Sequence, residues 1–320
     1  MLNRAWPGGR LYKIGASALA LALLATAPLY FSRLSLLFFI LNWIVLAESF
    51  NIFTGLTGYV NFGHVVFYGM GGYVGALLMA GALASPYVGV LAAGLASALL
   101  ALGLSLPTLR LRGAYFAIAS LGVNEATFVI FDNWPAVGSA TGITLPVVYY
   151  QPLAQYYTML AVAAGCLATA YVLMHSRIGT AMQAIRQQED TARSVGINAT
   201  YYKTLALIFS GLFAGMAGAL AIWQVSIIDP PSAFDITISL NAISMTMLGG
   251  IGTLAGPVLG AVVLYEVGDF LDLNYPYAHL VVLGVIIIGV VLAMPRGMMG
   301  YADRVRLLLG GGGRKDGGGA

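Results

Sequence analysis

The chain has 320 residues, of which 59% are apolar and only 8% are charged, and its mean hydropathy is +0.87. Soluble globular domains carry about 25% charged residues, so this composition excludes an ordinary soluble protein and indicates an integral membrane protein. The formal net charge of +3 is too small to indicate a nucleic-acid partner. Cys166 is the single cysteine, which excludes an internal disulfide and a cluster of thiol metal ligands.

The first apolar stretch, residues 14–30, has two interpretations. It is long enough to be a spanning helix, but its basic start, apolar core and Ala25-Thr26-Ala27 sequence also resemble a secretory signal peptide with its cleavage site. Pro28 would directly follow the cut, which favours the spanning helix.

Further apolar stretches follow along the chain. A spanning helix needs about 20 predominantly apolar residues, and the sequence offers about ten such stretches. They are residues 14–30, 34–52, 64–83, 87–107, 114–131, 156–175, 204–224, 237–251, 254–270 and 278–294. The sequence therefore predicts an all-α membrane protein with about ten transmembrane helices, or about eight or nine if a glycine-broken stretch is re-entrant.

Positive charges collect on one side of this topology. With ten spans and an N-terminus inside, all of the 15 lysines and arginines except Arg33 fall on the cytosolic side. Cytoplasmic loops of membrane proteins carry an excess of Lys and Arg. We therefore expect a multi-pass protein of the cell membrane, in contact with the lipid bilayer, with both termini in the cytosol.

Glycine interrupts two of the apolar stretches. The first is NIFTGLTGYVNFGHVVFYGMGGYVGALL, which begins at Asn51, and the second is LGGIGTLAGPVLGA, from Leu248 to Ala261. Non-helical backbone at membrane depth is tolerated only inside protein or around a water-filled cavity, and transporters build their substrate sites there. One interruption in each half is compatible with an inverted repeat. The alternative is that these glycines only permit close helix packing.

Three glutamates lie within predicted spans, at Glu48, Glu125 and Glu266, and Asp269 lies near the end of one. A charged side chain in the membrane costs several kcal/mol of free energy unless it is paired or hydrated, so these carboxylates are functional candidates. The deeper pair, Glu125 and Glu266, would suit an ion-coupled secondary transporter; the alternative is a structural role. His64 has no ligand-type neighbours at metal-binding spacing, so no metal site is predicted.

Residues 176–203 form a polar run on the predicted cytosolic side. Ile178, Met182 and Ile185 repeat at helical spacing, and Ala192 and Val195 continue the stripe. Gly196 is placed to end this helix in the left-handed conformation. The pattern predicts one amphipathic helix that rests on the bundle and presents its other side to a partner; the alternative is an ordinary surface loop.

The chain lacks the parts of an ATPase. A phosphate-binding loop needs GxxxxGK followed by Ser or Thr, and Lys203, which does precede Thr204, follows no glycine loop. No nucleophile motif or metal spacing indicates an enzyme. ATP-driven work would therefore need a partner chain.

Four regions, in order, carry a family resemblance. They are the stretch that begins at Asn51, RLRGAYFAIASLGVNE from Arg110, RIGTAMQAIRQQEDTARSVGINATYYKTLALIFSGLFAGMAGAL from Arg177, and MLGGIGTLAGPVLGAVVL from Met247. Together they resemble the permease subunits of ABC importers for branched-chain amino acids, the LivH/LivM type, and in particular the LivM branch. The resemblance covers most of residues 50–265.

The resemblance implies site residues. It makes Glu189–Gly196 an EAA-like loop whose helix inserts into a cleft of a cytosolic ATPase, although Asp190-Thr191 departs from the usual small or apolar pair. The implied coupling residues are Arg186, Glu189, Asp190, Ala192, Arg193 and Gly196. The implied translocation pathway contains Gly55, Gly58, Asn61, Gly63, His64, Phe67, Gly72, Tyr73, Tyr115 and Phe116, and we add Glu125 as the carboxylate candidate.

The resemblance also implies a function. The chain would consist of a permease domain at 1–294, with a coupling loop at 176–203, and a cytosolic tail at 295–320 that is disordered at its end. It would work with two ATPases, a second related permease and an extracytoplasmic binding protein. The chain itself would be no enzyme and hold no cofactor, because ATP and Mg²⁺ would bind to the partners. The implied substrates are leucine, isoleucine and valine, with urea or short amides as alternatives. An ion-coupled transporter and a structural membrane subunit are the other functional classes.

Overall fold

The computed structural model describes residues 24–28, 30, 33–81, 85–146, 150–275, 284–285 and 297–299. The predicted span 278–294 and the predicted tail 295–320 lie almost entirely outside these residues, as does most of the span 14–30. Within them the fold is helical, apart from β1 (Ile143–Thr144) and β2 (Ile227–Ile228), which pair antiparallel. The all-α prediction is confirmed for this part of the chain.

The helices follow the predicted stretches. In chain order they are α2 (Leu34–Phe50), the π-helical η1 (Asn51–Gly55), α3 (His64–Ala80), α4 (Pro86–Thr108), α5 (Ala114–Asn133), the 3-10 turns η2 (Pro135–Val137) and η3 (Ser139–Thr141), α6 (Pro152–His175), α7 (Arg177–Gln187), α8 (Glu189–Ser194), α9 (Ala199–Val225), α10 (Pro230–Ala233), α11 (Ile236–Gly249) and α12 (Ala255–Asn274).

Five helices of the described chain are long and apolar enough to cross a membrane: α2 with η1, α4, α5, α6 and α9. The shorter α3 has 17 residues, and α11 has only 14, about 21 Å at 1.5 Å per residue, so α11 does not cross a bilayer alone. The predicted count of ten spans is thus not confirmed, and neither is the inverted repeat.

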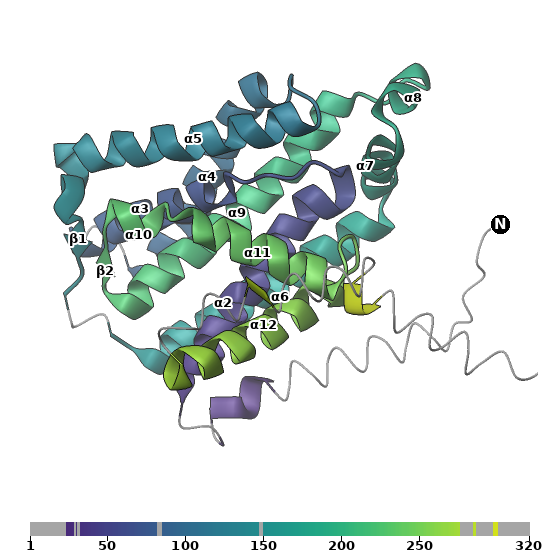
Figure 1. The fold of residues 1–320 in the computed structure, drawn as a ribbon. Helices are drawn as coiled ribbons and strands as arrows, with labels where there is room; N and C mark the ends of the chain where they lie inside the picture. Colours follow the sequence, from purple (N-terminus) through teal and green to yellow (C-terminus); the bar gives the residue numbers. More distant parts are fainter. Residues whose placement is uncertain are drawn as a thin grey trace, which may run out of the picture.

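Helix α9 lies at the centre of the bundle and packs closely on α3 and α4 (Figure 1). Small residues make this approach possible: a methyl group added at Gly71 of α3 would overlap the backbone of Gly215, and one added at Gly75 would lie 2.7 Å from Ala219. Because membrane helices associate mainly by close packing, these contacts hold the core together. The packing interpretation therefore applies to this part of the glycine-rich stretch.

The connections gather at two ends of the bundle (Figure 1). At one, the α8 end, Tyr59 and Arg112 of two connections contact Glu189 and Asp190 of α8. At the other, β1 pairs with β2 next to α10. The α8 end thus contains the connections that the positive-inside rule places in the cytosol, although the orientation itself stays a prediction.

The polar run differs from its prediction, because it forms two helices rather than one. The backbone turns extended at Gln188, with φ −160° and ψ 108°, so that α7 ends and α8 begins in a new direction. Met182, Ile185 and Ala192 are buried as predicted, whereas Ile178 and Val195 are exposed. The break carries no glycine or proline signal; contacts made by Glu189 with distant residues hold α8 in its direction.

Candidate functional site

The two glycine-broken segments meet at Asn51. This fully buried side chain follows α2 directly, where the helix widens into the π-turn η1. Its Oδ1 accepts a hydrogen bond of 2.8 Å from the backbone N–H of Gly252, and its Nδ2 donates one of 2.9 Å to the carbonyl of Thr253. The amide thus joins the end of α2 to the turn between α11 and α12, about 200 residues later in the chain.

Arg186 of α7 reaches the same junction. The end of a helix leaves carbonyl groups without a partner, and Arg186 Nη1 donates a hydrogen bond of 2.5 Å to one of them, at Gly55. Gly58 follows with φ +79°, and its Cα lies against the Arg186 stem, where an added Cβ would meet Cγ at 3.0 Å. The arginine therefore fastens α7 to the broken end of α2.

A hollow opens at this junction and is lined by Gly55, Gln183, Arg186, Gln187 and Gly252. It brings together Gly55 from the predicted pathway set and Arg186 from the predicted coupling set. The two sets were inferred from separate regions of the sequence, and the structure places them in contact.

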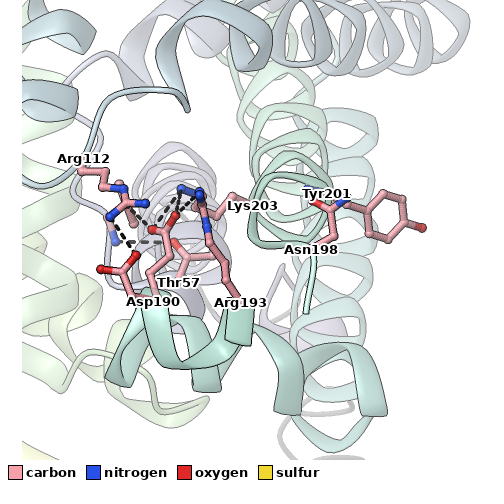
Figure 2. A network of polar contacts seen from close by, with 9 residues as sticks. Thr57, Arg112, Asp190, Arg193, Asn198, Tyr201 and Lys203 are labelled. Atoms are coloured by element: carbon pink, nitrogen blue, oxygen red, sulfur yellow. Dashed lines mark hydrogen bonds and ion pairs between the residues drawn. The ribbon is translucent and has the colours of Figure 1, made fainter. Parts of the chain in front are cut away.

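Glu189 lies at the centre of a second contact between α8 and the bundle, and Figure 2 labels two of its partners, Arg193 and Lys203. Its two carboxylate oxygens lie 3.2 Å from the Lys203 ammonium, and Oε1 also accepts a bond of 2.6 Å from Arg193. The hydroxyl of Tyr59, which lies in the connection between η1 and α3, donates a hydrogen bond to Oε2. The Glu189 side chain is 9% exposed and that of Lys203 is 0% exposed.

The surroundings of Glu189 favour its charged form. Burial raises the pKa of this carboxyl, but the hydrogen bond from Tyr59 and the charges of Lys203 and Arg193 outweigh it, so the pKa lies below its ordinary value. The pKa of the Tyr59 hydroxyl is raised, first by burial and then by its bond to Glu189. Tyr59 therefore remains a hydrogen-bond donor to an ionised carboxylate. Lys203 also lies over the Tyr59 ring, 4.3 Å from its centre.

Helix α8 has an inner and an outer face. Ala192 is buried against Ile185 and Ala199 on the inner face. On the outer face Asp190 forms an exposed ion pair of 2.9 Å with Arg112 (Figure 2), and Val195 is 72% exposed. Thr191 and Ser194 are exposed as well.

Gly196 ends α8 as predicted, with φ +87°. The N–H of Ile197 bonds to the carbonyl of Ala192 and that of Gly196 to Arg193, each at 3.0 Å, which is the pattern of a glycine-terminated helix.

Four predicted pathway residues line one hollow between α3, α4, α5 and α9. They are Asn61, Gly63, Phe67 and Phe116, and Leu104, Thr108, Ser120, Val123 and Leu207 complete its wall. The hydroxyl of Ser120 accepts a hydrogen bond of 3.0 Å from the N–H of Phe62, which holds α5 to the segment before α3. Residues 58–63, called the 58–63 connection, lead into α3, and two of them, Asn61 and Gly63, form part of the wall of this hollow.

Other predicted pathway residues lie elsewhere. Gly72 packs against Ile222 of α9 and Ile228, and Tyr73 is buried with the rings of Phe131 and Phe234. His64 hydrogen-bonds to Ser49 at 3.0 Å in the bundle interior.

Two of the predicted pathway residues, Tyr115 and Glu125, lie exposed on α5 in the single chain. Glu266 is exposed on α12, on the opposite side of the bundle from α5 (Figure 1), so it does not pair with Glu125 in one relay. Glu48 is buried, and one of its oxygens accepts a bond of 3.3 Å from Asn51.

Sequence reasoning missed Asn51, Tyr59 and Lys203 as members of the site. Lys203 had a signal, since a lysine at the start of an apolar helix needs a partner. Tyr59 had none, because its partner Glu189 lies 130 residues away in the chain.

Comparisons with known proteins identify a family and several similar proteins. Residues 32–291 match the family described as "Branched-chain amino acid transport system / permease component". The chain is 28% identical to the high-affinity branched-chain amino acid transport system permease protein LivM of Salmonella typhimurium, over 80% of this chain and 67% of that protein. For LivH of the same organism the values are 26%, 82% and 92%. The ribose import permease protein RbsC of Escherichia coli is 30% identical over 39% of this chain and 41% of its own length.

Proposed function

The chain belongs to the family of permease components of branched-chain amino acid transport systems, and we propose that it is the membrane-spanning subunit of an importer driven by separate ATPase chains. One observation carries the proposal: Arg186 and Glu189 fasten the helix pair α7–α8 to the broken end of α2, next to the hollow of the predicted pathway. A helix pair held in this way suits the transmission of movement from a soluble partner to a membrane pathway.

In this proposal the ATPase binds the outer face of α8. Asp190, Thr191, Ser194 and Val195 are exposed there, and an exposed valine beside polar groups suits the edge of a protein interface. ATP and Mg²⁺ bind to the ATPase, and the permease itself carries out no chemical step. The α8 end then lies in the cytosol, as the positive charges predict.

The substrate passes from an extracytoplasmic binding protein, which docks at the β1–β2 end, into a pathway shaped by Asn61, Gly63, Phe67 and Phe116. A second related permease completes the membrane part, as the presence of LivM and LivH in one family suggests. ATP binding and hydrolysis move α8, and the 58–63 connection opens and closes the hollow. Such a transition needs two packed states whose balance the ATPase shifts.

The proposed substrates are leucine, isoleucine and valine, because the family and its LivM and LivH members carry that description. The hollow at Phe67 and Phe116 has a volume of about 20 Å³, room for about one water molecule, so in this conformation it is closed to an amino acid. Its wall is mostly aromatic and apolar, which suits apolar side chains once it opens, and the amide of Asn61 is a polar group in it. Urea or short amides remain the alternative, and uptake competition separates the two classes.

Reconstitution tests this proposal. The permease pair, the ATPases and the binding protein are placed in proteoliposomes, and uptake of labelled leucine is measured with and without ATP. We expect uptake only with ATP and the complete set of subunits. Uptake by the permease alone, driven by a proton or sodium gradient, would sink the proposal in favour of secondary transport.

A further inference from the structure

We infer that Tyr59 and Lys203 are positioning residues that grip Glu189 and convert movement of α8 into movement of the 58–63 connection. This inference rests on the proposed function. It assigns to Glu189 a role inside the permease rather than at the ATPase surface. The contact formed by Glu189, Tyr59 and Lys203 is called the latch below.

The direction of α8 depends on such contacts. The helix has only six residues, and a helix of that length is unstable by itself in water. The exposed ion pair between Arg112 and Asp190 contributes little, because both side chains are at least half exposed. The latch is different: Lys203 is buried, and loss of its partner leaves a buried charge uncompensated. The latch is therefore the firm connection between α8 and the bundle.

The latch leads directly to the predicted pathway. The ring of Tyr59 packs edge-to-face on Phe116 of α5, with 5.5 Å between ring centres, and Phe116 lines the hollow. Asn61, two residues after Tyr59, lines the same hollow. Phe53, just before the helix end, also contacts Phe116 at 5.7 Å. Movement of the Tyr59 ring thus changes the wall on two sides.

Backbone geometry allows this connection to move separately from the helices beside it. Gly58 has φ +79°, and residues 58–61 lie outside regular helix. Arg186 holds the chain just before this point, at Gly55, and the latch holds it just after. The two attachments come from α7 and α8, which the extended backbone at Gln188 separates. A rotation of α8 relative to α7 therefore acts on the short segment between Gly55 and Tyr59.

The test compares isosteric variants in the complete transporter, reconstituted as above, and measures leucine uptake per ATP hydrolysed. Tyr59→Phe removes only the hydroxyl, and Glu189→Gln removes only the charge. Tyr201→Phe is the matched control, because Tyr201 lies at the same end but is exposed and points away from the latch (Figure 2). We expect uptake per ATP to fall about ten-fold in Tyr59→Phe, the effect of one lost hydrogen bond to a charged group. We expect at least the same fall in Glu189→Gln, which also loses the charge that pairs with Lys203 and Arg193, and no change in the control.

A double variant separates transmission from general weakening. Since Tyr59 acts through Glu189, whereas Glu189 also contacts Lys203 and Arg193, the loss in Tyr59→Phe with Glu189→Gln is expected to equal that of Glu189→Gln alone. Co-purification with the ATPase is expected to stay intact, because the outer face of α8 is unchanged. If Tyr59→Phe keeps the wild-type ratio of uptake to ATP hydrolysis, or if the two losses multiply, the inference is overturned. If the wild-type complex shows no ATP-driven uptake, the proposed function itself fails.

Discussion

Replacement of Asn51 by alanine tests the junction of the two broken segments. The change removes two hydrogen bonds to the backbone, of 2.8 Å from Gly252 and 2.9 Å to Thr253, and a longer one of 3.3 Å to the Glu48 carboxyl. Each backbone group left without a partner costs about 1–3 kcal/mol, and both are partly accessible, so values near the lower limit apply. We therefore expect the free energy of unfolding to fall by about 2–3 kcal/mol.

Denaturant unfolding of the purified permease in detergent, followed by tryptophan fluorescence, measures this loss. Asn133→Ala is the matched control, because the Asn133 amide bonds to a carbonyl of its own helix on an exposed surface. Hydrogen exchange of the Gly252 amide supplies a local readout, and we expect it to accelerate in Asn51→Ala only. A difference between the two variants below about 0.5 kcal/mol, with unchanged exchange at Gly252, would refute the reasoning.

Three further predictions concern packing, the ATPase surface and pH. Gly71→Ala makes the added methyl group overlap the backbone of Gly215 and is expected to lower the stability by about 1–3 kcal/mol in thermal unfolding. Gly103→Ala is the control, because a methyl group added there has no neighbour within 4 Å, and it is expected to be neutral or stabilising; equal effects of the two variants would contradict the packing argument. Val195→Asp is expected to weaken binding of the ATPase about ten-fold in a pull-down titration without changing the folded permease, and unchanged binding would place the interface elsewhere. Because the pKa of Glu189 in the folded protein lies below the ordinary carboxyl value of 4.5, its ionised form stabilises the fold above pH 4.5, and this stabilisation is lost as the pH falls through the pKa of the folded state. The difference in unfolding free energy between wild type and Glu189→Gln is therefore expected to shrink below about pH 4.5, and a difference that stays constant with pH would contradict this.

Local features of the sequence predicted most of the helices, the breaks and the family. Hydropathy placed the helices α2 to α6 and α9 within a few residues, because about 20 apolar residues in a row have few other uses. Glycine clusters predicted the breaks after Asn51 and before α12, and Gly196 was correctly placed as a helix end. The ordered motifs indicated the permease family, which the match over residues 32–291 establishes.

Contacts between distant parts of the chain could not be predicted from these local features. Helical spacing predicted one amphipathic helix at 178–195, but the structure divides it at Gln188, because Glu189 bonds to Tyr59 and Lys203 instead of continuing the stripe. The role of each residue in the glycine-rich stretch also depends on which helix lies opposite it. Gly71 and Gly72 pack against neighbouring helices, whereas Asn61 and Gly63 line the hollow.

The sequence by itself determined that this protein is a bundle of membrane helices with two broken segments and one long polar run. Those properties follow from hydropathy, charge and backbone freedom, which act over a few neighbouring residues. Only the tertiary structure decided that Asn51 and Arg186 join the two breaks and that Glu189 faces inward. The physical reason is that a hydrogen bond depends on a few ångströms in space, and the residues that form these bonds lie 130 or more positions apart in the chain.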